Sequence, residues 1–278
     1  MNVFSDKVAV VTGASSGMGR SLAVELARRG AKLALCDINE AGLEETARLC
    51  EKFAPEVETA VINVAERESV LAWADSVAHH YGAVHYVFNN AGIGFIGTVE
   101  RSEFKDIERV MDVDFWGVVN GTKAFLPHLL ASGDGHVVNT SSILGLFSLP
   151  ASNAYSAAKF AVRGFTESFR QEMLVTKQPI KVTCVYPGGI KTDFAHSTTS
   201  VGGEGLEAFS NGMDRLLTTS ADSAAKTILK GVERGQPKIL VGLDASVVDV
   251  LARILGSNYQ RLVAKISGRL MPKAMLHS

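Results

Sequence analysis

The sequence has few of the features that mark specialised classes of protein. It has only three cysteines, at positions 36, 50 and 184, and their spacing is not that of a metal site. So small and odd a number fits a reducing cytoplasm better than a disulfide framework. The 28 basic and 29 acidic residues leave a net charge of -1. A nucleic-acid-binding protein usually has a basic excess, so none is expected here.

Long apolar runs and targeting signals are also missing. No window has the roughly 18 uninterrupted apolar residues of a membrane-spanning helix. The start, MNVFSDKVAVV, has no basic region followed by an apolar stretch and a cleavage site, so we expect no signal peptide. The adjacent histidines 79 and 80 would point in different directions on a helix, so we expect no metal site. These absences predict a cytoplasmic protein.

Short β-branched runs alternate along the chain with helical patterns, which predicts parallel strands joined by helical crossovers. Several of the runs are almost continuously apolar, as expected for strands covered on both faces. The predicted strands are 7–12, 32–37, 57–63, 84–89, 135–141, 180–186 and 238–242, and the predicted helices are 17–29, 40–53, 66–81, 103–130, 152–176 and 221–234. The fold class is therefore α/β, with a doubly wound seven-stranded parallel sheet of the Rossmann type in one domain, residues 1–245.

Two segments depart from this alternation. Residues 193–220 are rich in Gly, Ser and Thr and are predicted to form a lid loop. Residues 246–278 form a C-terminal extension in which apolar residues recur at helical spacing and no acid follows Asp249. This basic amphipathic segment has three possible docking places, namely a neighbouring subunit, a membrane surface or its own domain.

The first predicted strand leads into TGASSGMGR, where a helix begins. A glycine-rich turn between a strand and a helix N-terminus can cradle a pyrophosphate, because the backbone approaches closely and free N–H groups point outward. The glycines follow GxxxGxG rather than the commoner GxGxxG. The residues of this turn expected to bind a cofactor are Gly13, Ser15, Ser16, Gly17, Met18 and Gly19.

The second predicted strand ends in Asp37, which predicts the choice of cofactor. A carboxylate there can accept hydrogen bonds from the ribose hydroxyls of NAD, and it would repel the 2′-phosphate of NADP. Neighbouring residues such as Ile38 offer no positive charge, and Arg20 should point away from the ribose. The alternative role for Asp37 is to cap the helix that starts near residues 39–40.

Tyr155 and Lys159, in YSAAK, stand one helical turn apart and so share a face. This pair is one of five motifs that appear in order between residues 5 and about 242. The motifs are TGASSGMG at 12–19, NNAG at 89–92, NTSS at 139–142, YSAAK at 155–159 and PGGIKT at 187–192. Together they make the chain resemble the short-chain dehydrogenase/reductase family, whose members transfer hydride between a nicotinamide cofactor and a substrate.

The resemblance implies a role for each residue of the catalytic motifs. Tyr155 is the expected general acid/base, and Lys159 is expected to lower the pKa of the phenol and to bind the nicotinamide ribose. Ser142 is expected to hydrogen-bond the substrate oxygen, whereas Ser141 should cap the next turn. Further cofactor contacts are implied for Asn63, Val64, Asn90, Ala91, Gly92, Pro187, Gly188, Ile190 and Thr192.

One residue departs from the family pattern. Asp114 stands where the family usually has an Asn that belongs to its catalytic tetrad. The family account predicts that the backbone carbonyl at this place matters more than the side chain. A carboxylate near Lys159 would nevertheless raise the pKa of the lysine and weaken its pull on the phenol.

The expected substrate side is apolar and contains no arginine to clamp an anion. Its large side chains are Phe95, Ile96, Ile143, Leu144, Phe147, Phe194 and Phe209. We therefore predict a lipophilic secondary alcohol or ketone as substrate. The resemblance also implies a homodimer or homotetramer packed through 103–130 and 152–176. The alternatives are a non-catalytic, nicotinamide-binding regulator and a membrane-associated member of the family.

Overall fold

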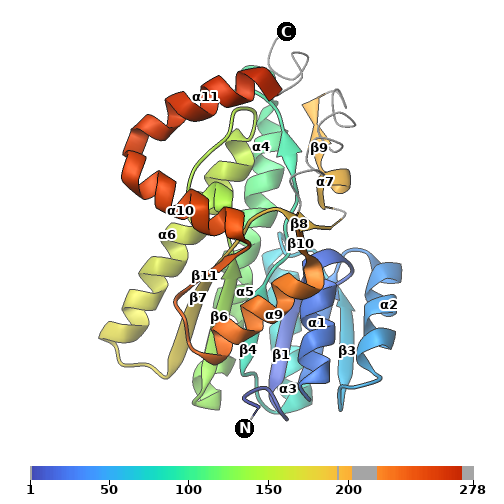
Figure 1. Ribbon diagram of the computed structural model, residues 1–278. Helices are drawn as coiled ribbons and strands as arrows, with labels where there is room; N and C mark the ends of the chain where they lie inside the picture. Colours follow the sequence, from blue (N-terminus) through green and yellow to red (C-terminus); the bar gives the residue numbers. More distant parts are fainter. Residues whose placement is uncertain (1, 193, 202–217, 271–278) are drawn as a thin grey trace.

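The computed structural model describes residues 2–192, 194–201 and 218–270, and a parallel sheet of seven strands lies at its centre (Figure 1). The strand order is β11-β7-β6-β4-β1-β2-β3. The strands are β1 Val8–Thr12, β2 Lys32–Asp37, β3 Val57–Val61, β4 Tyr86–Asn89, β6 Gly135–Thr140, β7 Ile180–Pro187 and β11 Lys238–Val241. Each overlaps one predicted run, so the doubly wound Rossmann-type fold is confirmed. The strand order reverses between β1 and β4, where such folds bind their ligands.

Helices cover both faces of the sheet, which is why the strands are apolar on both sides. In β1, Ala9 and Val11 belong to one buried layer, and Val8 and Val10 belong to the other. The first layer includes α1 Gly17–Arg28, α2 Glu40–Cys50 and α9 Ala221–Glu233. The second includes α3 Arg67–Tyr81, α5 Gly117–Ser132 and α6 Asn153–Val175. Each fully buried Val or Leu stabilises these layers by about 1.5–3 kcal/mol.

The segment predicted as a single helix at 103–130 is interrupted. Helix α4, Phe104–Met111, passes through a π-helical turn, Asp112–Trp116, into α5. A π turn inserts one extra residue into the helix, and such turns are frequent at functional sites. Here it places Asp114 in the interior, where its side chain is 0% exposed. Hydrophobic periodicity could not predict this interruption, because the apolar pattern continues across it.

Shorter elements lie beyond the carboxyl ends of the strands. They are β5 Phe95–Ile96, paired with β9 Thr199–Ser200, and β8 Ile190–Lys191, paired with β10 Thr219–Ser220. Helix α7, Phe194–Ser197, belongs to the predicted lid, of which residue 193 and residues 202–217 lie outside the described residues.

The C-terminal extension forms two helices that bend around this end of the molecule, drawn in red at the upper left of Figure 1. Helix α10, Leu243–Leu255, is followed by a 3-10 turn, Gly256–Asn258, and by α11, Tyr259–Leu270. Helix α10 therefore begins slightly before the predicted boundary at residue 246. Within the residues that the structure describes, no helix combines the length and apolarity needed to cross a membrane.

Candidate active site

The glycine-rich turn brings the backbone of β1 against the first turn of α1. Gly13 and Gly17 adopt φ angles of +67° and +51°, a region that glycine enters readily and other residues rarely enter. A Cβ atom on Gly19 would lie 1.9 Å from the carbonyl oxygen of Gly13. The close approach of the two segments therefore requires a glycine at position 19.

The start of α1 offers N–H groups for an anion. Ser16 is the N-cap residue, and its side chain makes no capping hydrogen bond. The first N–H groups of a helix have no partner within the helix, and the helix dipole favours negative charge at this end. Met18 is partly buried and packs against the core, so it anchors the turn. The arrangement fits the pyrophosphate of a dinucleotide.

Asp37 lies at the end of β2 and hydrogen-bonds the backbone of the glycine-rich turn. One of its carboxylate oxygens accepts a hydrogen bond from the N–H of Ser15 at 3.0 Å, and the other accepts one from the N–H of Asn39 at 3.0 Å. The alternative role as a helix cap is wrong, because Asn39 is the N-cap of α2 and its side chain accepts from the N–H of Gly42. The next residue, Ile38, is 69% exposed.

Arg20 is engaged with α2. Its guanidinium lies 3.0 Å from the carboxylate of Glu45 and donates to the carbonyl of Gly42 and to the hydroxyl of Thr46. It also donates to the carbonyl of Ser15. This cation therefore stabilises the back of the cradle and already has an acidic partner.

The loop after β4 is fastened to the end of β1. The hydroxyl of Thr12 accepts hydrogen bonds from the N–H groups of Asn90 and Ala91, both at 3.0 Å. The side-chain amide of Asn90 donates to the carbonyls of Thr12 and Gly13 at 3.1 and 3.3 Å. The predicted residues Asn90 and Ala91 thus lie beside the glycine-rich turn. Sequence reasoning missed Thr12, although a hydroxyl at the strand end before Gly13 was an available signal.

Asn63 and Val64 follow β3 at the same edge of the sheet. The side-chain oxygen of Asn63 accepts from the N–H of Ala65 at 3.1 Å, and its amide donates to Glu66 at 3.3 Å. Val64 is 7% exposed and packs against Gly117. Both hydrogen-bonding ends of Asn63 are thus used within its own turn, and its contact with an adenine stays a prediction.

The loop after β7 lies against the glycine-rich turn and against the C-terminal extension. A Cβ atom on Gly17 would lie 3.2 Å from the side chain of Thr192. The N–H of Gly188 donates to the carbonyl of Val241 at 2.9 Å. The N–H of Gly189 donates to the carboxylate of Asp244, in the first turn of α10, at 2.6 Å. Pro187 ends β7 and Ile190 is buried, so both hold this loop in place.

The structure brings the three predicted catalytic side chains together. The Nζ of Lys159 lies 5.4 Å from the ring centroid of Tyr155 on the same helix, α6. Ser142, two residues after β6, lies within hydrogen-bonding reach of the phenol. Its hydroxyl also accepts from the N–H of Leu144 at 3.1 Å, so Ser142 caps the next turn. The capping role predicted for Ser141 is wrong, because its hydroxyl donates to the carbonyl of Lys159 at 2.8 Å.

Asp114 joins this group through its own side chain. One carboxylate oxygen lies 3.0 Å from the Nζ of Lys159, and the other accepts from the N–H of Ile93 at 2.8 Å. The lysine also donates to the carbonyl of Thr140 at 3.3 Å, and only 3% of its side chain is exposed. A Cβ atom on Gly92 would lie 3.2 Å from the Asp114 carboxylate, so Gly92 borders the ion pair.

Burial and charge oppose each other in this group. Burial raises the pKa of Tyr155, Lys159 lowers it, and Asp114 raises it again, so that it lies above its ordinary value. The expected pull of the lysine is present, but burial and the carboxylate outweigh it. Burial alone would lower the pKa of Lys159, yet the charge of Asp114 and the phenol raise it above its ordinary value. Burial also raises the pKa of Asp114, against the opposing effect of Lys159.

Apolar side chains surround Tyr155. The ring of Phe194 lies 5.7 Å from the ring of Tyr155, and Phe95 packs in the same cluster. Phe95 and Ile96 are 4% and 5% exposed, so these two belong to the core more than to an open pocket. Ile143, Leu144 and Phe147 are half-buried, and Phe209 lies outside the described residues.

The C-terminal extension contacts the expected substrate loop. The hydroxyl of Tyr259, at the start of α11, accepts from the N–H of Ser148 at 3.2 Å. The rings of Tyr259 and Phe147 meet edge to face at 6.1 Å. One side of the extension thus contacts its own domain, at this loop and at the Gly189 loop, while docking on a neighbouring subunit or a membrane surface stays a prediction. Neither Tyr259 nor Asp244 was singled out from the sequence.

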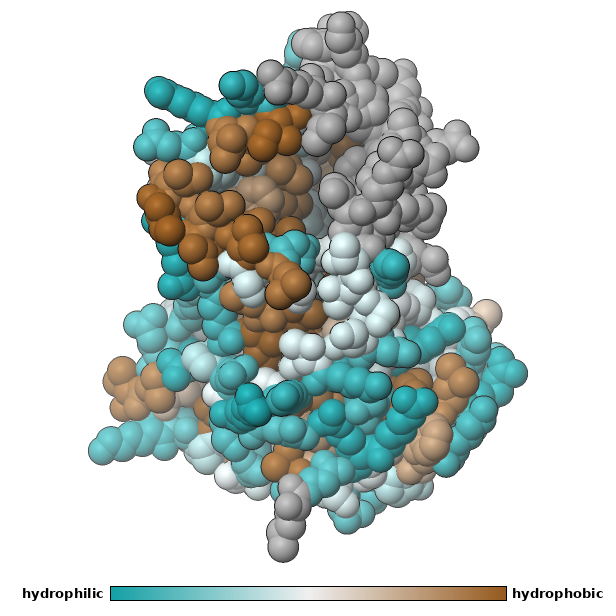
Figure 2. Space-filling view, viewed as in Figure 1, coloured by the Kyte–Doolittle hydropathy of each residue, from teal (hydrophilic) through white to brown (hydrophobic). Residues whose placement is uncertain are grey.

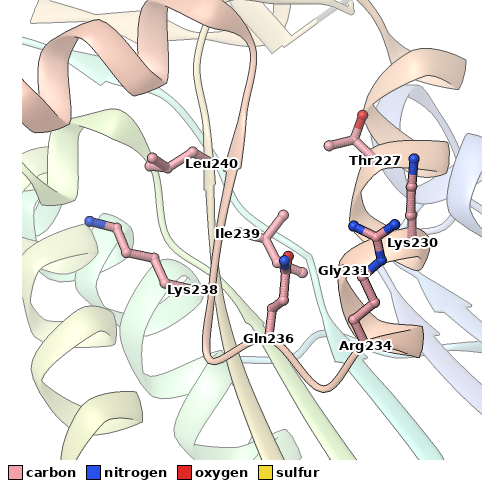
Figure 3. A pocket seen from close by; sticks show the side chains of 8 residues that line it. All are labelled: Thr227, Lys230, Gly231, Arg234, Gln236, Lys238, Ile239 and Leu240. Carbon is pink, nitrogen blue, oxygen red and sulfur yellow. The ribbon is translucent and has the colours of Figure 1, made fainter.

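A separate recess lies between α9 and the start of β11 (Figure 3). Thr227 and Lys230 on α9 and Arg234 just after its end line one side, Gln236 and Ile239 line the other, and Lys238 points to the other side of the strand. Lys238 is paired there with Asp249. The recess begins at the amino end of β11, whereas the residues described above follow the carboxyl ends of the strands. It is therefore distinct from the cofactor and catalytic groups.

Comparisons with known proteins agree with this arrangement. A family model described as short chain dehydrogenase matches residues 7–201. The chain is 58% identical over 275 residues to "Putative oxidoreductase SadH" of Mycobacterium tuberculosis (strain ATCC 25618 / H37Rv), covering 99% of this chain and 100% of that protein. It is 30% identical to Homo sapiens "Estradiol 17-beta-dehydrogenase 11" over 254 residues, 91% of this chain and 80% of that protein.

Among solved structures, a short chain dehydrogenase/reductase from Burkholderia phymatum in complex with NAD superposes with a TM-score of 0.85. It is 28% identical, and the match covers 92% of this chain and 96% of that one. The fold, the order of the motifs and these relatives lead to one assignment. The chain is an oxidoreductase of the short-chain dehydrogenase/reductase family.

Proposed function

We propose that this protein catalyses the NAD-dependent interconversion of lipophilic secondary alcohols and ketones. The observation that carries the proposal is the group formed by Ser142, Tyr155 and Lys159. It lies at the edge of the sheet that also holds the glycine-rich cradle, with apolar side chains around the phenol. A proton donor and a nucleotide cradle at the same edge of the sheet support a reaction that couples proton transfer to hydride transfer.

The residues present fit a bound NAD. The close approach of Gly13 and Gly19 leaves a backbone cradle for the pyrophosphate, and Asp37 stands at the ribose end. The loops that contain Asn90 and Gly188 would flank the nicotinamide half, as the family resemblance implies. When bound, NAD supplies the hydride acceptor, and its reduced form supplies the hydride donor.

The side chains of this protein supply the proton chemistry. Tyr155 takes the proton from the substrate hydroxyl during oxidation and returns it to the carbonyl oxygen during reduction. Ser142 hydrogen-bonds the same oxygen, and the charge of Lys159 favours the phenolate. Asp114 opposes that effect, so oxidation should be fastest at alkaline pH.

The preference for NAD follows from Asp37 and its surroundings. Its carboxylate would repel a 2′-phosphate, and the adjacent Ile38 offers no counter-charge. Arg20 already pairs with Glu45 on α2. The preference for a lipophilic substrate rests on Phe194 and its apolar neighbours. It also gains support from the human relative, whose name describes an estradiol dehydrogenase.

A graded panel of secondary alcohols, incubated with NAD and measured by the appearance of NADH, tests the activity. Turnover should increase with apolar size, and Tyr155→Phe should abolish it without loss of folding. The matched control is Tyr86→Phe, because Tyr86 is also buried but its hydroxyl donates to the carbonyl of Val3, away from the site. Tight NAD binding without turnover of any alcohol or ketone would contradict the proposal and favour a nicotinamide-binding regulator.

Paired variants at Asp37 test the cofactor preference. Asp37→Asn retains a hydrogen-bond acceptor for the N–H of Ser15 but removes the charge, so it should weaken discrimination against NADP. Adding Ile38→Arg should reverse the preference. The ratio of kcat/KM for the two cofactors is the measurement. Equal use of NAD and NADP by the unmodified protein would refute the role of Asp37.

A further inference from the structure

Helix α10 turns its most apolar face away from the protein. Its buried side carries Ala245, which is 0% exposed, and Asp249, which is paired with Lys238. On the other side five large apolar residues recur at the spacing of one helical face. They are Leu243, Val247, Val250, Leu251 and Ile254, and they are 87%, 56%, 53%, 44% and 75% exposed. A helix that only packs on its own domain would face the other way.

The exposed face continues onto α11. Leu262 and Ile266 lie one turn apart, and each is 48% exposed. Tyr259 and Val263, on the neighbouring positions, are turned inward. In Figure 2 a brown hydrophobic area covers the upper left of the molecule, where Figure 1 places α10 and α11. The outer apolar stripe consists of seven residues, namely Leu243, Val247, Val250, Leu251, Ile254, Leu262 and Ile266.

Positive charge borders the outer apolar stripe. Arg261 and Lys265 are exposed and lie one turn apart on α11, directly next to Leu262 and Ile266. No acidic residue follows Asp249 anywhere in the sequence, whereas Arg253, Arg261, Lys265, Arg269 and Lys273 do. An apolar stripe beside basic residues is the pattern of helices that lie in the interface of an anionic bilayer.

We propose that the outer apolar stripe binds the surface of a membrane that contains anionic lipids. The apolar side chains would enter the boundary between headgroups and acyl chains, while Arg261 and Lys265 would contact lipid phosphates. The proposal concerns an interaction surface and does not depend on the catalytic activity. It does place the membrane beside the loop that Tyr259 holds at Ser148.

A second copy of the chain is the less favourable occupant, for an electrostatic reason. A two-fold contact sets the same patch of each subunit against itself. The row of Arg261 and Lys265 would then approach its own copy, and like charges across an interface are unfavourable. An anionic lipid surface complements the same row.

Vesicle flotation with the full-length protein tests the proposal. The protein should float with vesicles of phosphatidylcholine and phosphatidylglycerol, and at least tenfold less should float with phosphatidylcholine alone. Val250→Asp with Ile254→Asp should abolish flotation, and Arg261→Glu with Lys265→Glu should reduce it at least tenfold. The matched control is Val99→Asp, because Val99 is 76% exposed but lies outside α10 and α11. Binding of NAD should be the same in all variants, which shows that they are folded.

Two outcomes would overturn the proposal. One is equal flotation of the parent and of the Val250→Asp, Ile254→Asp variant. The other is failure of the parent protein to float with the anionic vesicles. In that case the oligomeric mass of the double variant is compared with that of the parent by light scattering. A lowered mass would assign the outer apolar stripe to an interface between copies. Absence of dehydrogenase activity would leave these results unaffected, so the two proposals fail separately.

Discussion

The ion pair between Asp114 and Lys159 gives a prediction that stability measurements can quantify. The two side chains are 0% and 3% exposed, and the joined atoms are 3.0 Å apart. Removing one partner of a buried pair leaves an uncompensated charge and typically costs about 3–5 kcal/mol. For a chain of roughly this size, about 2–4 °C in Tm accompanies each kcal/mol. Asp114→Ala should therefore lower Tm by about 6–20 °C.

Asp114→Asn should cost much less. The amide oxygen can still accept the hydrogen bond from the N–H of Ile93, and Lys159 keeps the carbonyl of Thr140 as an acceptor. The variant also no longer buries a carboxylate whose pKa is raised by that burial. The expected loss is about 1–3 kcal/mol, below the range for Asp114→Ala.

The same substitution should shift the pH profile of alcohol oxidation. Asp114 raises the pKa of both Tyr155 and Lys159, so its neutralisation lowers both. Oxidation requires the deprotonated phenol, and its rate rises as pH passes through the pKa of that group. The rising limb of kcat against pH should therefore move to lower pH in Asp114→Asn. Asp75→Asn, at an exposed aspartate paired with His128, is the control and should leave the profile unchanged.

Two results would refute this reasoning. Matching profiles for the parent and Asp114→Asn would show that the carboxylate has no influence on proton transfer. Complete loss of activity in Asp114→Asn, with NAD binding and Tm preserved, would show instead that the carboxylate takes part in catalysis itself. Both are measured on purified protein with a substrate established for the parent.

Three further predictions address the cradle, the extension and the assembly. Gly19→Ala should weaken NAD binding at least tenfold in a fluorescence titration, because its Cβ would collide with the carbonyl of Gly13, whereas Gly164→Ala, with open space around it, should not. Tyr259→Phe removes two hydrogen bonds with Ser148, each worth about 1 kcal/mol, so KM for large alcohols should rise severalfold or more with KM for NAD constant. Equal changes in both KM values would contradict that role. Light scattering at micromolar concentration should show a dimer or tetramer packed through 103–130, which contains α4 and most of α5, and 152–176, which contains α6, and a monomer would contradict it.

The sheet was predictable because its signal is local. Each strand is a short run whose alternate residues enter two buried layers, as Val10 and Val11 do, so composition alone reveals it. The catalytic group was predictable through its motifs. The π turn was not predictable. It changes which carbonyl each backbone N–H bonds to, but it leaves the pattern of apolar residues unchanged. The sequence predicted the effect of Lys159 on the pKa of Tyr155 but not the upward direction of the overall shift. That direction depends mainly on how deeply the phenol is buried, which neighbouring residues in the sequence do not reveal.

Contacts of the extension with the catalytic end escaped prediction for a different reason. Asp244 meets Gly189 across 55 residues of sequence, and Tyr259 meets Ser148 across 111. No periodicity links residues so far apart in the sequence, and none of these four residues belongs to a pattern in its own segment that would predict its partner. Only the folded path of α10 and α11 brings them together.

The hydrogen bond from Gly189 to Asp244 joins the expected nicotinamide loop to the helix that carries the outer apolar stripe. Two ligands that act on one shared contact are thermodynamically coupled, and the coupling is the same in both directions. If a bilayer fixes α10 in the position that favours this bond, it tightens nucleotide binding by some factor. Bound nucleotide must then tighten attachment to the bilayer by that same factor, so the occupancy of the cofactor site would help to determine where in the cell the protein resides.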